Sequence, residues 1–343
     1  FPANRIQKAE MANVIIGIHG LGNKPPKKVL EEWWLLSMAE GLEKKKIIAR
    51  SAHFEIAFWA DIIHKQSLDP EEKDPESPLF IDEKYETAPE DFVPEDISTR
   101  KRIVDFLGPQ MNRIFLNDDL TLNYSFITDA VISRYFNDLE EYYTGTITTA
   151  NNAIVRTAYV IRERLYELLQ KHRNDKIMLL SHSMGSVIAF DVLTFLAREI
   201  KVNTLVTMGS PLGLPVVISR IAAEQKQRGI YKGRIATPPG VVENWYNFSD
   251  ILDKVAFNYR LSDYYNENEA GVKPVDFLVV NDYEANGVRN PHKSFGYLRT
   301  PEFAEILNTF LLTEKLSARE KLAKKVAFLK EGLRSKLKGI KKK

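Results

Sequence analysis

The sequence contains no cysteine, no long apolar run and almost no net charge, and each absence excludes a class of protein. Without cysteine the chain forms no disulfide, holds no cysteine-based zinc site and has no thiol nucleophile, which suits a reducing compartment. No apolar run approaches the roughly 18–20 residues that a membrane-spanning helix needs. A net charge of +2 over 343 residues creates no overall field that would attract nucleic acid. We therefore expect a globular, cytoplasmic protein that binds no nucleic acid.

The spacing of apolar residues predicts strands that alternate with helices along most of the chain. Short β-branched runs indicate buried strands, and apolar residues at every third or fourth position indicate helices. We expect strands at 14–18, 54–59, 176–180, 204–208, 241–248 and 275–280, and helices at 29–45, within 103–132, and at 150–172, 185–199 and 301–312. This alternation is typical of a mostly parallel sheet with helices on both faces. We assign the α/β class to residues 11–313, with Met11 as the expected start of the domain.

Residues 69–96 interrupt this alternation with an acidic, proline-rich segment. The segment holds 12 acidic residues, 2 lysines and 5 prolines, which prevent a regular element and keep the segment solvated. We expect residues 65–150 as a whole to form an inserted cap between the early strands and the central one. Within it, 69–96 are either a surface loop or the rim of a lid over an active site.

The last 30 residues form a second, basic unit. Residues 314–343 carry 12 Lys/Arg and 3 Glu, whereas the rest of the chain has an excess of acidic residues. Apolar residues recur at every third or fourth position along it, among them Leu322, Val326, Leu329 and Leu333. This spacing predicts a basic amphipathic helix. It either lies on an anionic membrane surface or packs against the folded body or another copy of the chain, so the oligomeric state stays open.

The stretch KIMLLSHSMGSVIAFDVL, residues 176–193, places Ser183 between an apolar strand and an apolar helix. A serine at such a strand-to-helix turn, flanked by small residues, is the nucleophile elbow pattern G-x-S-x-G. Here the flanking residues are Ser181 and Gly185, and serine tolerates a positive φ less well than glycine does. At the N-terminus of a helix, the dipole and the unpaired N–H groups favour a developing anion. We predict that Ser183 is a nucleophile.

A serine nucleophile needs a histidine base and a carboxylate that orients the base. Of the six histidines, His292 lies after the strand predicted at 275–280 and before the last helix, where the base belongs if the chain order is nucleophile, acid, histidine. The acid should then follow the strand predicted at 241–248. Asp253 is our candidate, because the pattern Asp-x-Val places the carboxylate in the loop and the valine in the core. Asp250 is the alternative acid.

Acyl transfer also needs two backbone N–H donors aimed at the oxygen on which negative charge develops. The N–H of Met184, directly after the nucleophile, is one candidate. The loop after the first strand, HGLG at 19–22, contains glycines that let its backbone approach a substrate. The N–H of Leu21 in this loop is the second candidate.

Together these stretches resemble the α/β-hydrolase superfamily and, within it, the lipase and esterase branch. VIIGIHGLGN resembles the first strand and oxyanion loop of that family, LLSHSMGS resembles its elbow, and TMGSPLG resembles the strand and turn that follow. The resemblance covers about residues 12–313. It implies an eight-stranded, mostly parallel sheet and an acyl-enzyme mechanism. In that mechanism Ser183 attacks a carbonyl carbon, His292 takes and returns the proton, and Asp253 holds the imidazole.

We therefore expect a serine hydrolase that cleaves carboxylic esters, with a small-molecule or lipid ester as its substrate. A peptidase or a thioesterase would use the same three residues. An inactive hydrolase fold that serves as a binding or scaffold protein is the remaining alternative. We expect neither a metal nor a cofactor, because the sequence has no HExxH motif and no paired-histidine spacing.

Deleting residues 314–343 tests the two interpretations of the tail. If the tail lies on a membrane, the truncated protein no longer sediments with anionic vesicles but hydrolyses a soluble short-chain ester as fast as the full chain does. Vesicle co-sedimentation and an ester assay, each on both proteins, measure these outcomes. Loss of folding on truncation, followed by circular dichroism, would instead identify a helix that packs against the body.

Overall fold

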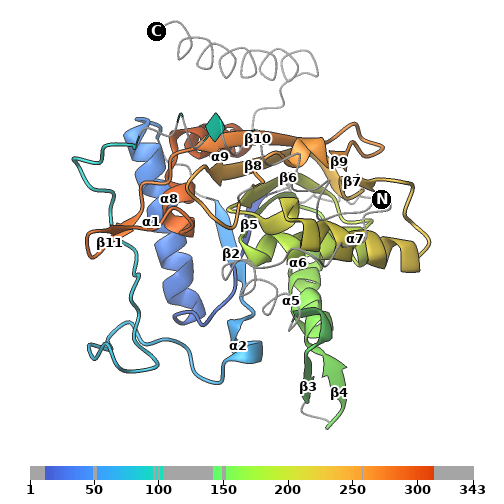
Figure 1. Ribbon diagram of the computed structural model, residues 1–343, viewed down its shortest axis with the longest axis horizontal. Coiled ribbons are helices and arrows are strands. Elements are labelled where there is room, and N and C mark those ends of the chain that lie inside the picture. The colour runs from blue at the N-terminus through green and yellow to red at the C-terminus, as the bar shows by residue number, and fades with distance from the viewer. Residues whose placement is uncertain are drawn as a thin grey trace, which may run out of the picture. The chain divides into compact units, whose positions relative to one another are not determined.

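A parallel six-stranded sheet forms the centre of the folded domain (Figure 1). The computed structural model describes residues 12–48, 52–95, 98, 101–102, 105, 142–148, 152–256 and 258–312. The strands are β1 (Asn13–Ile18), β2 (His53–Ala57), β5 (Lys176–His182), β6 (Val202–Met208), β8 (Val241–Asp250) and β10 (Pro274–Val279), in the spatial order β10-β8-β6-β5-β1-β2. Every neighbouring pair is parallel. The α/β class is confirmed, but this sheet has six strands in the described residues rather than the eight that the resemblance implies.

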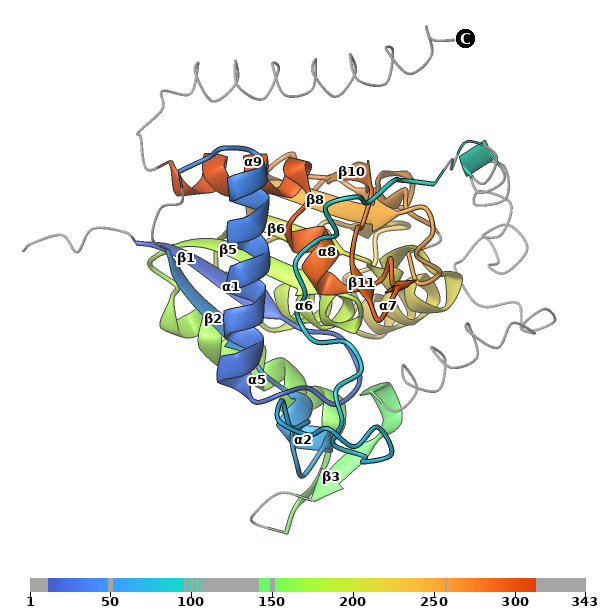
Figure 2. The ribbon, with the colours of Figure 1, turned by 90° about the vertical axis from the view of Figure 1, so that its left-hand side faces the viewer.

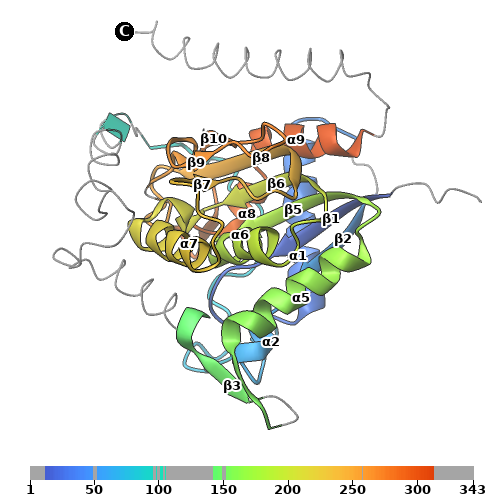
Figure 3. The same cartoon turned by 90° about the vertical axis from the view of Figure 1, so that its right-hand side faces the viewer.

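Helices cover both faces of this sheet. On one face lie α1 (Lys27–Lys44), α8 (Ser294–Leu298) and α9 (Pro301–Leu311), and on the other lie α5 (Thr157–Lys171), α6 (Met184–Phe195) and α7 (Pro215–Gln227) (Figures 2 and 3). Because it is covered on both sides, β5 has an unbroken run of buried residues, and α6 is buried along almost its whole length. The turn that joins β5 to α6 is therefore buried, and Ser183 is 3% exposed.

Short elements occupy the loops between these helices and strands. They are α2 (Ala60–Ile63), the 3₁₀-helices η2 (Pro211–Gly213) and η3 (Leu261–Asp263), and the strand pairs β3 (Thr146–Thr148) with β4 (Ile154–Arg156), β7 (Ile235–Ala236) with β9 (Tyr265–Asn266), and β11 (Glu284–Ala285) with β12 (Val288–Arg289). Across the described ranges, no helix is both long enough and apolar enough to span a bilayer.

Several predicted boundaries differ from the structure by a few residues, and the helix predicted at 185–199 ends at Phe195. The helix predicted at 150–172 begins only at Thr157, because the β-branched Ile154 and Val155 pair with β3 as strand β4. The strand predicted at 54–59 ends at Ala57. The helix predicted within 103–132, much of the predicted cap and the tail 314–343 lie outside the described residues.

The acidic segment forms no helix or strand over residues 69–95, as its prolines predict. It nevertheless contacts the domain at several points, among them α1 and the loop before α8. The Tyr85 hydroxyl donates to Glu40 of α1 at 3.1 Å, and Glu83 forms an ion pair of 2.9 Å with Lys293. The segment therefore joins α1 to the loop that precedes α8.

A buried ionic cluster ties α5 to α6 and α7. Arg162 donates from Nη2 to Asp191 at 2.6 Å and to Glu224 at 3.0 Å, and the Arg162 and Asp191 side chains are 3% and 0% exposed. The hydroxyls of Tyr142 and Tyr143 donate to the same Asp191 oxygen at 3.2 and 3.1 Å. Burial raises the pKa of Asp191 to about 6 although the guanidinium opposes the shift. The cluster therefore anchors the residues just before β3 to the core.

Replacing Arg162 by methionine leaves the Asp191 carboxyl buried without its cation. We expect Arg162→Met to lower the free energy of unfolding by about 3–5 kcal/mol, the usual cost of breaking a buried ion pair. Arg164→Met is the matched control on the same helix. Arg164 pairs with Asp61 at the surface, and such pairs contribute less than about 1 kcal/mol. Its further hydrogen bond to Phe58 O adds about 1 kcal/mol, so the control should lose clearly less than Arg162→Met. Urea unfolding followed by circular dichroism measures both variants, and equal losses would contradict the expectation.

Candidate active site

The carboxyl ends of the parallel strands place the three predicted residues at one edge of the sheet. Ser183 follows β5, Asp253 follows β8, and His292 lies between β10 and α8. In the sheet, β6 separates β5 from β8, and β10 lies beside β8. Because these strands run in the same direction, the loops after them meet, although Ser183 and His292 are 109 residues apart in the chain.

The three side chains form a continuous chain of hydrogen bonds. His292 Nε2 lies 3.0 Å from Ser183 Oγ, and His292 Nδ1 lies 2.9 and 3.0 Å from the two carboxylate oxygens of Asp253. The Asp253 side chain is fully buried, and that of His292 is 28% exposed. When Nδ1–H donates to the carboxylate, Nε2 is left to accept the serine proton, which is the tautomer that a general base needs.

The Asp253 carboxylate is held in place by its own loop and by α8. One oxygen accepts the backbone N–H of Val255 at 2.8 Å and of Ala256 at 3.3 Å, and the other accepts the Tyr297 hydroxyl at 2.7 Å. Sequence reasoning missed Tyr297. A tyrosine inside a short helix has no local pattern that would connect it to an aspartate 44 residues earlier.

Asp250, the alternative acid, lies elsewhere. Its carboxylate forms an ion pair with Arg289 at 2.8 Å and accepts the backbone N–H groups of Asn281 and Leu252, each at 2.7 Å. The carboxylate that meets the imidazole of His292 is that of Asp253, so the structure does not bring the alternative acid to the histidine. Asp250 instead joins the end of β8 to the loops after β10.

The turn at Ser183 is strained and tightly packed. Ser183 itself has a φ of 55°, a left-handed conformation that non-glycine residues seldom adopt. A Cβ added to Gly185 would lie 2.5 Å from the carbonyl oxygen of Ile18, so only glycine fits there. Ser181, by contrast, lies in β5 without a positive φ, and its hydroxyl donates to Val206 O at 2.9 Å. Serine at the first elbow position therefore adds no backbone strain.

His19 orients the loop that carries the predicted oxyanion donor. Its Nε2 accepts the Trp59 N–H at 3.1 Å, so the ring proton is on Nδ1, which donates to Gly20 O at 2.8 Å. Burial lowers the pKa of His19 well below 6.5, which keeps the ring neutral. Because the C=O and N–H of a trans peptide point in opposite directions, the bond to Gly20 O turns the Leu21 N–H away from His19. The second predicted donor, Met184 N–H, is at the first position of α6, where helical N–H groups lack an intrahelical acceptor.

Lys24 holds the other half of this loop. Its amino group contacts the carbonyl oxygens of Leu21, of Gly22 at 3.0 Å and of Asn23 at 3.4 Å. Burial lowers the pKa of Lys24 to about 7, and the positive charge of Lys293 acts in the same direction. The charge of this amino group therefore changes near neutral pH, next to the predicted site.

A cavity of about 790 Å³ opens beside Ser183 and His292. Its wall is largely apolar and includes Leu30, Trp33, Trp34, Trp59, Ile63, Leu68, Ile81, Ile161 and Phe295. Groups that can carry charge also line it, among them Lys24, His64, Glu83 and Lys293. An apolar cavity of this size with a few polar groups is typical of a small-molecule site.

Comparison with known protein families gives a match for the central part of the chain. Residues 110–231 match the family described as PGAP1-like alpha/beta domain, which is an α/β-hydrolase-type family. The chain has an α/β-hydrolase fold. The matched segment contains β5, α6 and β6, and so the elbow with Ser183, whereas Asp253 and His292 lie outside it. No curated protein matches the chain.

The substitution Gly20→Ala tests how closely the predicted oxyanion loop must approach the predicted nucleophile. A Cβ at residue 20 would lie 2.7 Å from Ser183 Cβ and 3.1 Å from its Oγ, so the loop or the serine must move. We expect the rate of labelling by a fluorophosphonate to fall by about 100-fold, because a shift near 1 Å at a reacting group has that effect.

Gly271→Ala is the control for this prediction. Gly271 also has a positive φ, of 71°, but an added Cβ there meets no atom within 4 Å. The control should lose stability through backbone strain and keep its labelling rate. A Gly20→Ala protein that labels as fast as the control would contradict the close approach.

Proposed function

We propose that this protein is a serine hydrolase that cleaves carboxylic esters through an acyl-enzyme intermediate. The observation that carries the proposal is the 3.0 Å distance from Ser183 Oγ to His292 Nε2, with Asp253 2.9 Å from the other imidazole nitrogen. A nucleophile, a base and an orienting carboxylate in this arrangement are what acyl transfer to serine requires. The α/β-hydrolase fold supports the same class of reaction.

In the acylation step, Ser183 Oγ bonds to the ester carbonyl carbon while His292 Nε2 takes the hydroxyl proton. Asp253 stabilises the resulting imidazolium, and the N–H groups of Leu21 and Met184 receive the negative charge on the carbonyl oxygen. The bond between that carbon and the alcohol oxygen then breaks. The departing alcohol takes the proton from His292.

The deacylation step repeats this sequence with water. His292 accepts a proton from a water molecule as the water oxygen bonds to the acyl carbon. The bond from that carbon to Ser183 Oγ breaks, and His292 returns the proton to the serine. The products are a carboxylic acid and the free enzyme.

The cavity supports an ester with an apolar acyl or alcohol group. Its tryptophans and aliphatic side chains offer apolar contact area, whereas its polar groups lie near the oxyanion loop and the His292 loop. The basic amphipathic pattern of residues 314–343 supports a lipid ester, met at an anionic membrane surface on the cytoplasmic side. A thioesterase, a peptidase and an inactive scaffold protein remain alternative outcomes of the test.

Fluorophosphonate labelling and ester hydrolysis by single variants test the proposal. We expect the folded wild-type protein to label and Ser183→Ala to show no labelling. Asp253→Asn should retain its fold and lose roughly 10⁴-fold in kcat, because an amide holds the imidazole in the wrong tautomer. Mass spectrometry of the labelled peptide and an assay with short-chain esters measure these outcomes.

Asp250→Asn is the matched control, since this carboxylate also belongs to the end of β8 but binds Arg289. This variant should lose stability and keep kcat within about 10-fold. The Asp250 carboxylate bonds to Arg289 and to two backbone N–H groups, not to the imidazole of His292. Thioesters and peptides assayed beside the esters identify the preferred bond. Absence of labelling in folded wild-type protein would support the inactive scaffold.

A further inference from the structure

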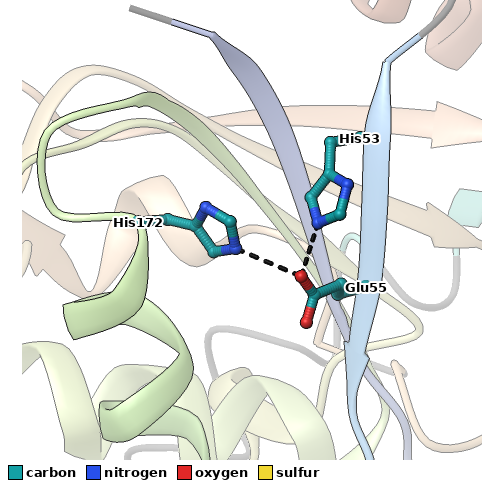
Figure 4. A group of neighbouring side chains, drawn as sticks. All are labelled: His53, Glu55 and His172. Carbon is teal, nitrogen blue, oxygen red and sulfur yellow. Dashed lines mark hydrogen bonds and ion pairs between the residues drawn. The ribbon is translucent and has the colours of Figure 1, made fainter. Parts of the chain in front are cut away.

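A cluster of two histidines and a glutamate lies at the amino end of β2 (Figure 4). In this parallel sheet, that end is opposite the strand ends that carry Ser183. His53 and Glu55 are two positions apart on β2 and so point to the same face of the strand. His172 directly follows α5 and reaches them from the other side. One nitrogen of each imidazole and one Glu55 oxygen all lie within 4.8 Å of one another.

The hydrogen bonds of His172 leave a conflict that a cation would remove. Its Nδ1 lies 3.0 Å from Asp175 Oδ2, and its Nε2 lies 3.3 Å from Glu55 Oε1. A neutral imidazole has only one N–H. If Nδ1 donates it to Asp175, the Nε2 lone pair faces a carboxylate oxygen, and two acceptors meet. Either a second proton or a metal ion between the two atoms makes this arrangement favourable.

The Glu55 oxygen is also crowded by nitrogen atoms. Besides His172, its Oε1 contacts His53 Nε2 and Lys171 Nζ. A carboxylate oxygen has two lone pairs, so it cannot accept a well-directed hydrogen bond from three donors at once. A metal ion bound to both imidazoles and to this oxygen would replace these competing hydrogen bonds, so the oxygen would no longer face more donors than it has lone pairs. The Lys171 side chain is 57% exposed and can move into solvent.

We infer that His53, Glu55 and His172 form a binding site for a divalent transition-metal ion, and that zinc suits these ligands best. Zinc binds imidazole nitrogen at about 2.0–2.1 Å and carboxylate oxygen at about 2.0–2.2 Å, so ligands at tetrahedral angles lie about 3.4 Å apart. His172 Nε2 and Glu55 Oε1 are 3.3 Å apart, which matches this spacing. His53 Nε2 lies closer to the same oxygen, so its exposed ring has to move outward when the ion binds. Asp175 supplies the carboxylate that commonly accepts the other ring N–H of a zinc-binding histidine.

The position of this site separates it from the residues of the proposed reaction. Metal binding joins the edge strand β2 to the turn between α5 and β5, which are contributed by distant parts of the chain. His53 is 51% exposed, so a water molecule can reach the fourth coordination position. The ion would hold the amino ends of β2 and β5 together, whereas the reaction proposed above takes place at the carboxyl ends. The inference is therefore independent of the proposed function.

Zinc titration of the full chain after treatment with a chelator tests the inference. We expect isothermal titration calorimetry to show one zinc ion per chain, with Tm rising as zinc is added. His172→Ala should weaken zinc binding by at least about 100-fold through loss of a ligand. Asp175→Asn should weaken it by about 10–100-fold, because it removes only the orienting carboxylate.

Two further variants separate a metal site from a cluster held by protons. Lys171→Met removes the amino group that competes for Glu55, so it should tighten zinc binding severalfold. Glu163→Gln, an exposed position on the same helix, should leave zinc binding unchanged. The inference is overturned if the wild-type chain takes up no zinc, or if His172→Ala and the wild type bind it equally well.

Discussion

The contact between the elbow and the strands beside it is the constraint on which the site depends. Ser183 keeps a backbone conformation that costs about 1–3 kcal/mol. Its N–H donates to Met208 O at the end of β6, and Gly185 packs against Ile18 O at the end of β1. Both neighbours of β5 therefore hold the turn. The same packing brings Gly20 against the serine, so the strained turn and the loop at residues 19–22 are a single packed unit.

The parts of this unit that are contiguous in the chain could be predicted from the sequence. An apolar strand, a serine and an apolar helix follow one another without a break, and each main-sheet strand is a short apolar run whose position was expected to within a few residues. Asp253 and His292 could be predicted because a parallel sheet brings the ends of its strands together. Once that topology is assumed, chain order leaves few candidates.

The side-chain contacts that decide between such candidates join distant segments, and these contacts could not be predicted. The choice between Asp253 and Asp250 depends on Tyr297 and Arg289, which belong to later loops, and the role of His19 depends on a tryptophan 40 residues away. The sequence predicted a longer helix than α5, because the helical spacing of apolar residues continues back through β4. The pairing of β4 with β3 is not visible in that spacing. The ligands of the inferred zinc site show no motif either, because the two strand residues and the histidine after α5 are 117 and 119 positions apart.

The chain order of the strands also matters while the protein is being synthesised. Translation proceeds from the N-terminus, so the elbow serine leaves the ribosome 109 residues before the imidazole that would remove its proton. Until the loop before α8 has emerged and docked, that serine is an ordinary alcohol. A nascent or prematurely terminated chain therefore lacks the arrangement on which the proposed reaction depends, because the imidazole meets the serine only after β10 and the loop before α8 have folded.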